Sequence, residues 1–129
     1  MNRIRIPLPL TSLILSLLLT ACGNDEPTPA KSREVKFEVT GNFSGTIDAT
    51  YITESGGATN ETLPALPWTK SINYQSSVSG TTITIGGGGG VAGQTLKVKV
   101  FAGGSVASET SGVANSSGII VIAAPTYIF

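Results

Sequence analysis

Short segments in which apolar and polar residues alternate constrain this fold more than any other feature of the sequence. In residues 33–40, every second position is apolar: Val35, Phe37 and Val39. The intervening positions are charged: Glu34, Lys36 and Glu38. Successive side chains of a β-strand point to opposite sides. The segment is therefore predicted to be a strand with one buried face and one face toward solvent.

Further segments of this kind follow along the chain, separated by glycine and proline. They are predicted as strands over residues 46–53, 58–63, 70–76, 81–85, 95–101, 105–109 and 118–124. The last of them is continuously apolar, which predicts burial on both faces. No segment shows a helical period. Many short strands with such turns indicate an all-β fold, here a small immunoglobulin-like β-sandwich of about seven or eight antiparallel strands over residues 33–129.

The N-terminal segment differs from this domain and is predicted to be a signal peptide, residues 1–21. Two basic residues, Arg3 and Arg5, precede an apolar run over residues 6–19. That run is too short to span a bilayer. A buried core helix is the alternative, and Pro7 and Pro9 argue against it because proline breaks a helix interior.

The end of this segment matches a bacterial lipobox, the cleavage motif of lipoproteins. Leu19, Thr20 and Ala21 precede Cys22, the one cysteine of the chain. A chance cysteine behind an ordinary signal peptide is the alternative. The match predicts cleavage before Cys22 and lipid on its sulfur and freed amine. Two or three acyl chains anchor a protein stably, whereas one binds marginally. The predicted partner is thus a membrane, and no thiol remains for a disulfide.

Residues 22–32 are predicted to be a flexible tether between lipid and domain, because they are polar and aperiodic and include Pro27 and Pro29. Asp25 and Glu26 resemble surface-export signals of some lipoproteins, although polar linkers are common. Gly23 is not the aspartate that often holds lipoproteins at the inner membrane. The expected location is the cell envelope, with the outer membrane favoured over the inner one and the membrane face left open.

Charge and residue types exclude several functions. All eight acidic residues but only six of the eight basic ones follow the predicted cleavage site, which gives 6 − 8 = −2 and no basic patch. Nucleic acid is therefore not an expected partner. The chain has no histidine, which rules out histidine-based triads and histidine metal sites. The acids Asp48, Glu54, Glu61 and Glu109 are scattered. We predict no catalytic residue, no metal, no cofactor and no enzyme activity.

Two conspicuous motifs have ordinary interpretations. Gly88, Gly90 and Gly93 reproduce the spacing of a dinucleotide-binding fingerprint. That fingerprint requires a helix next, and an alternating segment follows instead. The run of residues 86–90 is predicted to be a mobile loop between strands. Trp68, the one tryptophan, stands between two alternatives: an exposed contact for a ligand or partner, or a cap on one end of the core.

Several short motifs occur in an order and spacing that resembles the MmpS family, over residues 35–124. They are Val39-Thr40-Gly41, Thr50-Tyr51, Glu54-Ser55-Gly56-Gly57, Leu66-Pro67-Trp68-Thr69-Lys70, Leu96-Lys97-Val98-Lys99-Val100, Gly103-Gly104 and Val106. The resemblance implies a membrane-anchored, extracytoplasmic immunoglobulin-like sandwich that assists large export transporters. The chain departs from the family in its predicted lipid anchor, where the family has a transmembrane helix, and in lacking the family's paired cysteines.

Together these features lead to an expected function. The chain is expected to be an envelope lipoprotein whose domain is a non-enzymatic accessory or scaffold that binds another envelope protein, with a transporter as one candidate. The alternative is a surface module that binds a glycan or small molecule or mediates adhesion. An exposed edge strand could pair with a partner's backbone, and residues 46–53 or 105–109 are the predicted edges.

Overall fold

The computed structural model describes residues 30–129. The predicted signal peptide, the lipobox residues Leu19, Thr20 and Ala21, Cys22 and most of the predicted tether lie outside the described residues. Within residues 30–129, no helix is long and apolar enough to cross a membrane.

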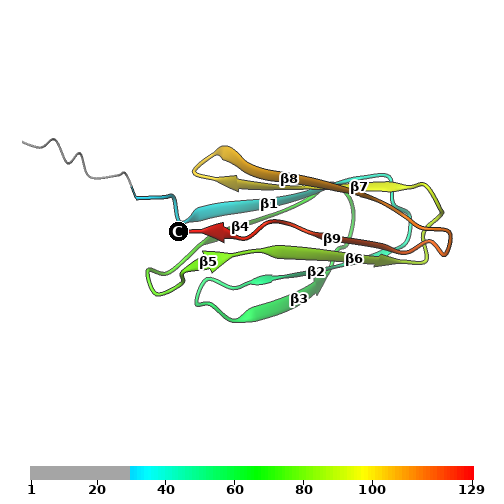
Figure 1. Cartoon of the computed structure of the whole chain (residues 1–129). Coiled ribbons are helices and arrows are strands. Elements are labelled where there is room, and N and C mark those ends of the chain that lie inside the picture. The colour runs from blue at the N-terminus through cyan, green and yellow to red at the C-terminus, as the bar shows by residue number, and fades with distance from the viewer. Residues whose placement is uncertain (1–29) are drawn as a thin grey trace, which may run out of the picture.

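The chain forms antiparallel strands that pack as a β-sandwich, which confirms the predicted all-β class (Figure 1). The strands are β1 (Glu34–Gly41), β2 (Thr46–Ile52), β3 (Ala58–Thr62), β4 (Trp68–Asn73), β5 (Gly80–Thr81), β6 (Ile83–Gly88), β7 (Thr95–Ala102), β8 (Ser105–Val113), β9 (Ile120–Ala123) and β10 (Tyr127–Ile128). Sheet A has the order β4-β1-β7-β8 and sheet B the order β3-β2-β6-β9, while β10 pairs with β5.

The core lies between the two four-stranded sheets and follows the alternation in the sequence. Val35, Phe37 and Val39 of β1 are each 0% exposed, and Glu34 is exposed while Lys36 and Glu38 are half-buried. Strand β7 repeats the pattern, with Leu96, Val98 and Val100 buried. The inward faces of β2, β6 and β9 supply the opposite wall: Ile47, Ala49, Tyr51, Ile83, Ile85, Ile120 and Ile122.

Strand β9 is buried on one face only, so the prediction of burial on both faces is wrong. Ile120 and Ile122 are buried, but Val121 is 70% exposed and Ala123 is exposed as well. The reason is that sheet B has sheet A on one side and solvent on the other. Val121 is apolar but lies on the open face. The sequence of β9 therefore resembles that of a strand buried on both faces, although only one face is covered.

The glycine run is largely a strand, which corrects the prediction of a loop over residues 86–90. Gly86, Gly87 and Gly88 belong to β6 and pair with β2, and two of them also pair with β9. Glycine is needed here for space: a Cβ on Gly87 would lie 2.7 Å from both the Phe43 ring and the Ile120 side chain. Phe43 comes from the turn after β1, far away in sequence, so the run alone does not reveal it.

This close packing gives a first prediction, on the stability of two neighbouring glycine variants. Gly87→Ala should lower the free energy of unfolding by about 1–3 kcal/mol, because overpacking forces the Phe43 ring and Ile120 apart. Gly86→Ala is the matched control, since a Cβ there meets nothing within 4 Å. It should change stability by less than about 0.5 kcal/mol. Urea denaturation of both variants measures the difference; equal losses would contradict the packing argument.

The two ends of the sandwich differ in which segments form them. The described chain enters at the end where it also finishes, which we call the proximal end (Figure 1). Arg33 fixes this entry: its guanidinium donates to the backbone oxygens of Gln75 (2.7 Å) and Val78 (2.8 Å) and lies 4.6 Å from the centre of the Phe129 ring. The opposite end, here called the distal end, consists of the loops over residues 42–45, 63–67, 89–94 and 114–119.

Candidate interaction surface at the distal end

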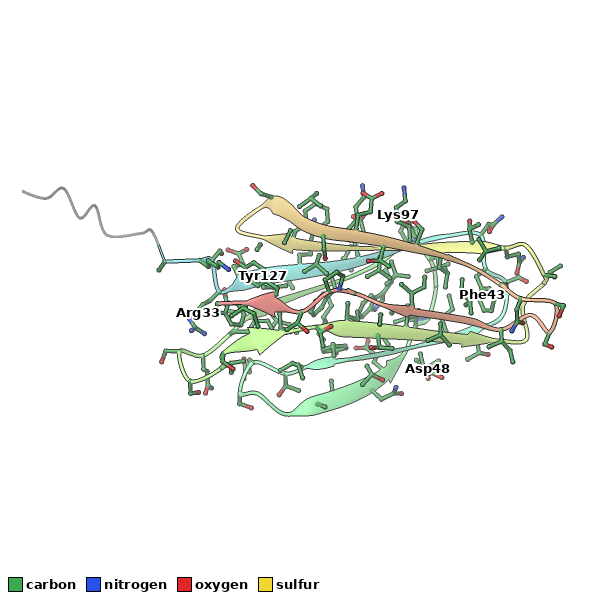
Figure 2. All side chains as sticks on the ribbon, viewed as in Figure 1. Arg33, Phe43, Asp48, Lys97 and Tyr127 are labelled. Carbon is green, nitrogen blue, oxygen red and sulfur yellow. The ribbon has the colours of Figure 1, made fainter. Side chains whose placement is uncertain are left out.

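The four distal loops carry no charged side chain. These loops, residues 42–45, 63–67, 89–94 and 114–119, contain no Asp, Glu, Lys or Arg. The charged residue nearest to these loops along the chain is Glu61, and Lys97 follows the third loop. Figure 2 shows Phe43 at the distal end and Arg33 and Tyr127 at the other. A surface without charge costs less to desolvate than the rest of this domain, which favours contact with another molecule.

Two amide side chains, Asn42 and Gln94, connect the first distal loop to the third loop and to the start of β7. The Asn42 Oδ1 atom accepts a hydrogen bond from the Thr95 N–H (2.8 Å). The Gln94 Oε1 atom accepts from the N–H groups of Ser44 (3.0 Å) and Val91 (2.9 Å). These bonds join the first loop to the third loop and to the start of β7.

The fourth distal loop is fixed in the same way. The Asn115 Oδ1 atom accepts from the N–H groups of Ser117 (2.9 Å) and Ile119 (3.0 Å). Backbone bonds from Gly90 to Gly118 (3.1 Å) and from Gly93 to Ala114 (3.0 Å) connect this loop to the third. A surface ordered in advance loses little conformational entropy when it binds.

The distal end also exposes apolar side chains beside two hollows. Val91 is 61% exposed and Ile119 47%, and Val113, at the end of β8, is 64% exposed. A hollow of about 460 Å³ lies beside Val113, next to the distal loops, and its lining includes Lys97. A second, of about 320 Å³, is lined by residues that include Asn42, Ser44, Pro64 and Leu66. Exposed apolar groups that are clustered and rimmed by polar ones mark interaction sites.

A third hollow, of about 440 Å³, lies beside the edge strand β4, and we call it the seam. Tyr51 lines it and donates a hydrogen bond to the Glu61 carboxylate at 2.7 Å. Burial, followed by this bond, raises the pKa of the Tyr51 hydroxyl to about 12. Glu54 and Lys70 also line the seam. Tyr51 therefore remains a neutral hydrogen-bond donor at physiological pH.

Three of the four scattered acids, Asp48, Glu61 and Glu109, each have a hydrogen-bond or ion-pair partner. The Asp48 carboxylate accepts from the Thr62 hydroxyl, Glu61 accepts from Tyr51, and Glu109 lies 3.1 Å from the Lys97 amine. Figure 2 shows Asp48 and Lys97 on opposite outer sides of the sandwich. Among residues 30–129, no group of three or more potential ligands is placed to hold a metal ion.

Trp68 lies in the core and not on the surface. It is 8% exposed, and its ring centre lies 6.2 Å from that of Tyr51. The alternative in which the indole caps the core therefore fits its position, and an exposed platform for a ligand or partner does not.

Of the two predicted edge strands, one is an edge and one is not. Strand β8 is an edge of sheet A, but β2 lies between β3 and β6. The prediction of an edge over residues 46–53 is thus wrong.

The residues that organise the distal end were missed by sequence reasoning. They are Asn42, Phe43, Gln94 and Asn115. Only Asn115 had a recognisable signal, since Asn followed by Ser-Ser-Gly is typical of a turn. The bonds of Gln94 to Ser44 cross a sequence separation of 50 residues, which no local pattern reports.

The fold and this surface define a small antiparallel β-sandwich with an ordered, uncharged end. No family model matches the chain, and no curated protein matches it significantly.

Proposed function

We propose that the protein is a non-enzymatic accessory lipoprotein of the cell envelope, and that its sandwich binds another envelope protein through the distal end. One observation carries this proposal. The distal loops are uncharged and ordered by hydrogen bonds, and they stand beside the exposed side chains Val91, Val113 and Ile119. This platform lies opposite the end where the chain enters the domain, so that an anchored domain can present it to a partner.

A protein partner suits this surface better than a small ligand does. The exposed apolar groups come from separate segments, the loop 89–94, the end of β8 and the loop 114–119, and they do not converge on one enclosed cavity. Protein interfaces typically have such an apolar centre with a polar rim and few charges. Lipid anchoring through Cys22 would raise the local concentration near membrane partners, so that a modest contact area is enough.

The resemblance to the MmpS family supports an export transporter as the partner, and the outer membrane remains the favoured location. The alternative function, binding of a glycan or small molecule, is best matched by the seam. Its lining combines the Tyr51 hydroxyl, the Lys70 amine and the Glu54 carboxylate, groups that hydrogen-bond to polar ligands.

The second prediction tests this proposal by photo-crosslinking in cells that make the protein. A photo-reactive amino acid at Val91 or Val113 should crosslink to one dominant envelope protein. The same probe at Thr50 or Ala107, which are exposed outside the distal loops, is the control and should give little product. Val113→Asp should reduce the Val91 crosslink roughly tenfold, as expected for an apolar contact near the centre of an interface.

Two results would contradict this assignment. Equal crosslinking from all four positions would show that contact is not confined to the distal end. Absence of any protein product, together with saturable glycan or small-molecule binding that Lys70→Ala abolishes, would favour the seam and the alternative function.

A further inference from the structure

The edge strands of the two sheets differ in how they are protected against pairing with another chain. Free edges expose unpaired backbone groups, and proteins block them with inward-pointing charges or bulges. Glu61 of β3 and Lys70 of β4 lie at inward positions of their strands, opposite Ala49 and Phe37 respectively. The pairing of β8 with β7 has a register shift between Val100 and Phe101 of β7, which is typical of a β-bulge. Three edges thus carry a recognisable block.

Strand β9 carries neither of these blocks. Its four residues are all apolar, and residues 110–129 contain no charged residue. Short length does not distinguish it, since the protected strand β3 has only five residues. Val121 and Ala123 are exposed on the outer face of β9. In the described sandwich, β9 is therefore the edge that is most open to a further strand.

The ladder with β6 fixes which backbone groups of β9 face outward. Ala124 donates its N–H to the Ile83 oxygen at 3.0 Å, and hydrogen-bonded pairs alternate along an antiparallel ladder. Ile122 and Ile120 therefore bond to β6, because they pair with Ile85 and Gly87. The N–H and C=O groups of Val121 and Ala123 point to the open side of the strand.

The open stretch is limited to these two residues. The next candidate, Ile119, already uses its N–H to bond the Asn115 side chain (3.0 Å) and its C=O to accept from the Asn115 N–H (2.9 Å). On the other side, Pro125 follows Ala124. A strand that pairs here must therefore satisfy two donors and two acceptors, at Val121 and Ala123.

We propose that a second copy of this chain occupies this edge, with the two β9 strands antiparallel and centred on Ile122. In this register Val121 lies opposite Ala123 of the partner subunit, and the reverse pair forms by symmetry. All free groups of both strands are then paired. The larger side chain of Val121 then faces the smaller one of Ala123 of the partner subunit, and no like charges are brought together. The two copies of sheet B become one continuous sheet.

Strand β8 of sheet A is the neighbour of β9 in the opposite sheet. Strand β8 approaches β9 at Gly112, where a Cβ would lie 2.8 Å from the Ile122 side chain. From there the two strands separate toward the proximal end (Figure 1). The pairing uses β9 and not the distal loops, so it does not depend on the proposed function.

Disulfide trapping tests the register with protein purified in detergent from expressing cells. Val121→Cys and Ala123→Cys proteins are mixed in equal amounts and oxidised, and the joined peptides are identified by mass spectrometry. We expect the mixed 121–123 disulfide to exceed either like pair several-fold, since directly opposite Cα atoms lie at a suitable distance. Asn60→Cys with Thr62→Cys on the β3 edge is the control and should give no such preference. Equal yields on both edges would overturn the proposal.

A second measurement follows the monomer–dimer equilibrium by analytical ultracentrifugation. Val121→Pro removes an N–H that is not used in the ladder with β6, so the domain should fold while dimer affinity falls at least tenfold. Asn60→Pro on β3 is the matched control and should leave dimerisation unchanged. If proline impairs folding, Val121→Lys against Thr69→Lys makes the same comparison. A protein that stays monomeric at all concentrations, or a dimer insensitive to both Val121 changes, would refute pairing through β9.

Discussion

Replacing Cys22 with serine is expected to abolish incorporation of a fatty-acid probe into the protein. The thioether to the lipid requires the cysteine sulfur, and this is the one cysteine of the chain. Each buried CH₂ of an acyl chain contributes about 0.8 kcal/mol to membrane binding, so loss of two or three chains removes stable anchoring. The measurement is metabolic labelling followed by fractionation of the envelope.

The control keeps the cleavage motif but changes another residue of it. Ala21→Gly retains a small residue before Cys22 and should retain the label. A Cys22→Ser protein that still takes up the probe and stays in the membrane fraction would refute the lipoprotein interpretation. In that case the proposed accessory function would need a different explanation for proximity to an envelope partner.

The start of the described domain is fixed at the proximal end. Arg33 donates hydrogen bonds to the backbone oxygens of Gln75 and Val78 and lies over the Phe129 ring, so the start of the domain is held by the turn after β4 and by the residue that follows β10. Tyr127 adds a hydrogen bond from its hydroxyl to the Ser32 oxygen at 3.2 Å. The predicted tether would therefore join the domain at the proximal end, away from the distal loops.

Period-two alternation was enough to predict most strands and their buried faces. For β1 and β7 the alternation and the burial agree at every buried position. It was not enough to place strands within a sheet, because residues 46–53 alternate in the same way whether β2 is an edge or, as observed, a central strand. The two-sided burial predicted for β9 failed for a different reason: its continuous apolar run does not record that one face of sheet B is open to solvent.

The distal end was less predictable than the strands because its order depends on long-range contacts. The glycine run looked flexible, since a sequence records the missing Cβ of Gly87 and not the Phe43 ring that fills its place. The amide of Gln94 looked like an ordinary polar residue until the turn after β1 was placed beside it. Local patterns thus identify the scaffold, and tertiary packing determines the candidate surface.

Phe37→Ala is expected to produce the largest loss of stability among single changes in the core. Phe37 is 0% exposed, and its ring centre lies 6.0 Å from that of Tyr51 on the opposite sheet. Removing a buried aromatic ring costs about 3–5 kcal/mol, because transfer energy is lost and the cavity closes only in part. Small domains have about 5–15 kcal/mol in total, so this variant should be mostly folded at low temperature and unfold early in urea.

Glu38→Ala, at the next position of the same strand, is the matched control. Glu38 is half-buried on the outer face of sheet A, between Thr69 and Lys99, and a surface change of this kind should cost less than about 0.5 kcal/mol. Urea denaturation should show a large shift in midpoint for Phe37→Ala and almost none for Glu38→Ala, with similar slopes because both expose the same surface on unfolding. Equal shifts would mean that β1 presents both faces equally to the core, which contradicts the register with β4 and β7.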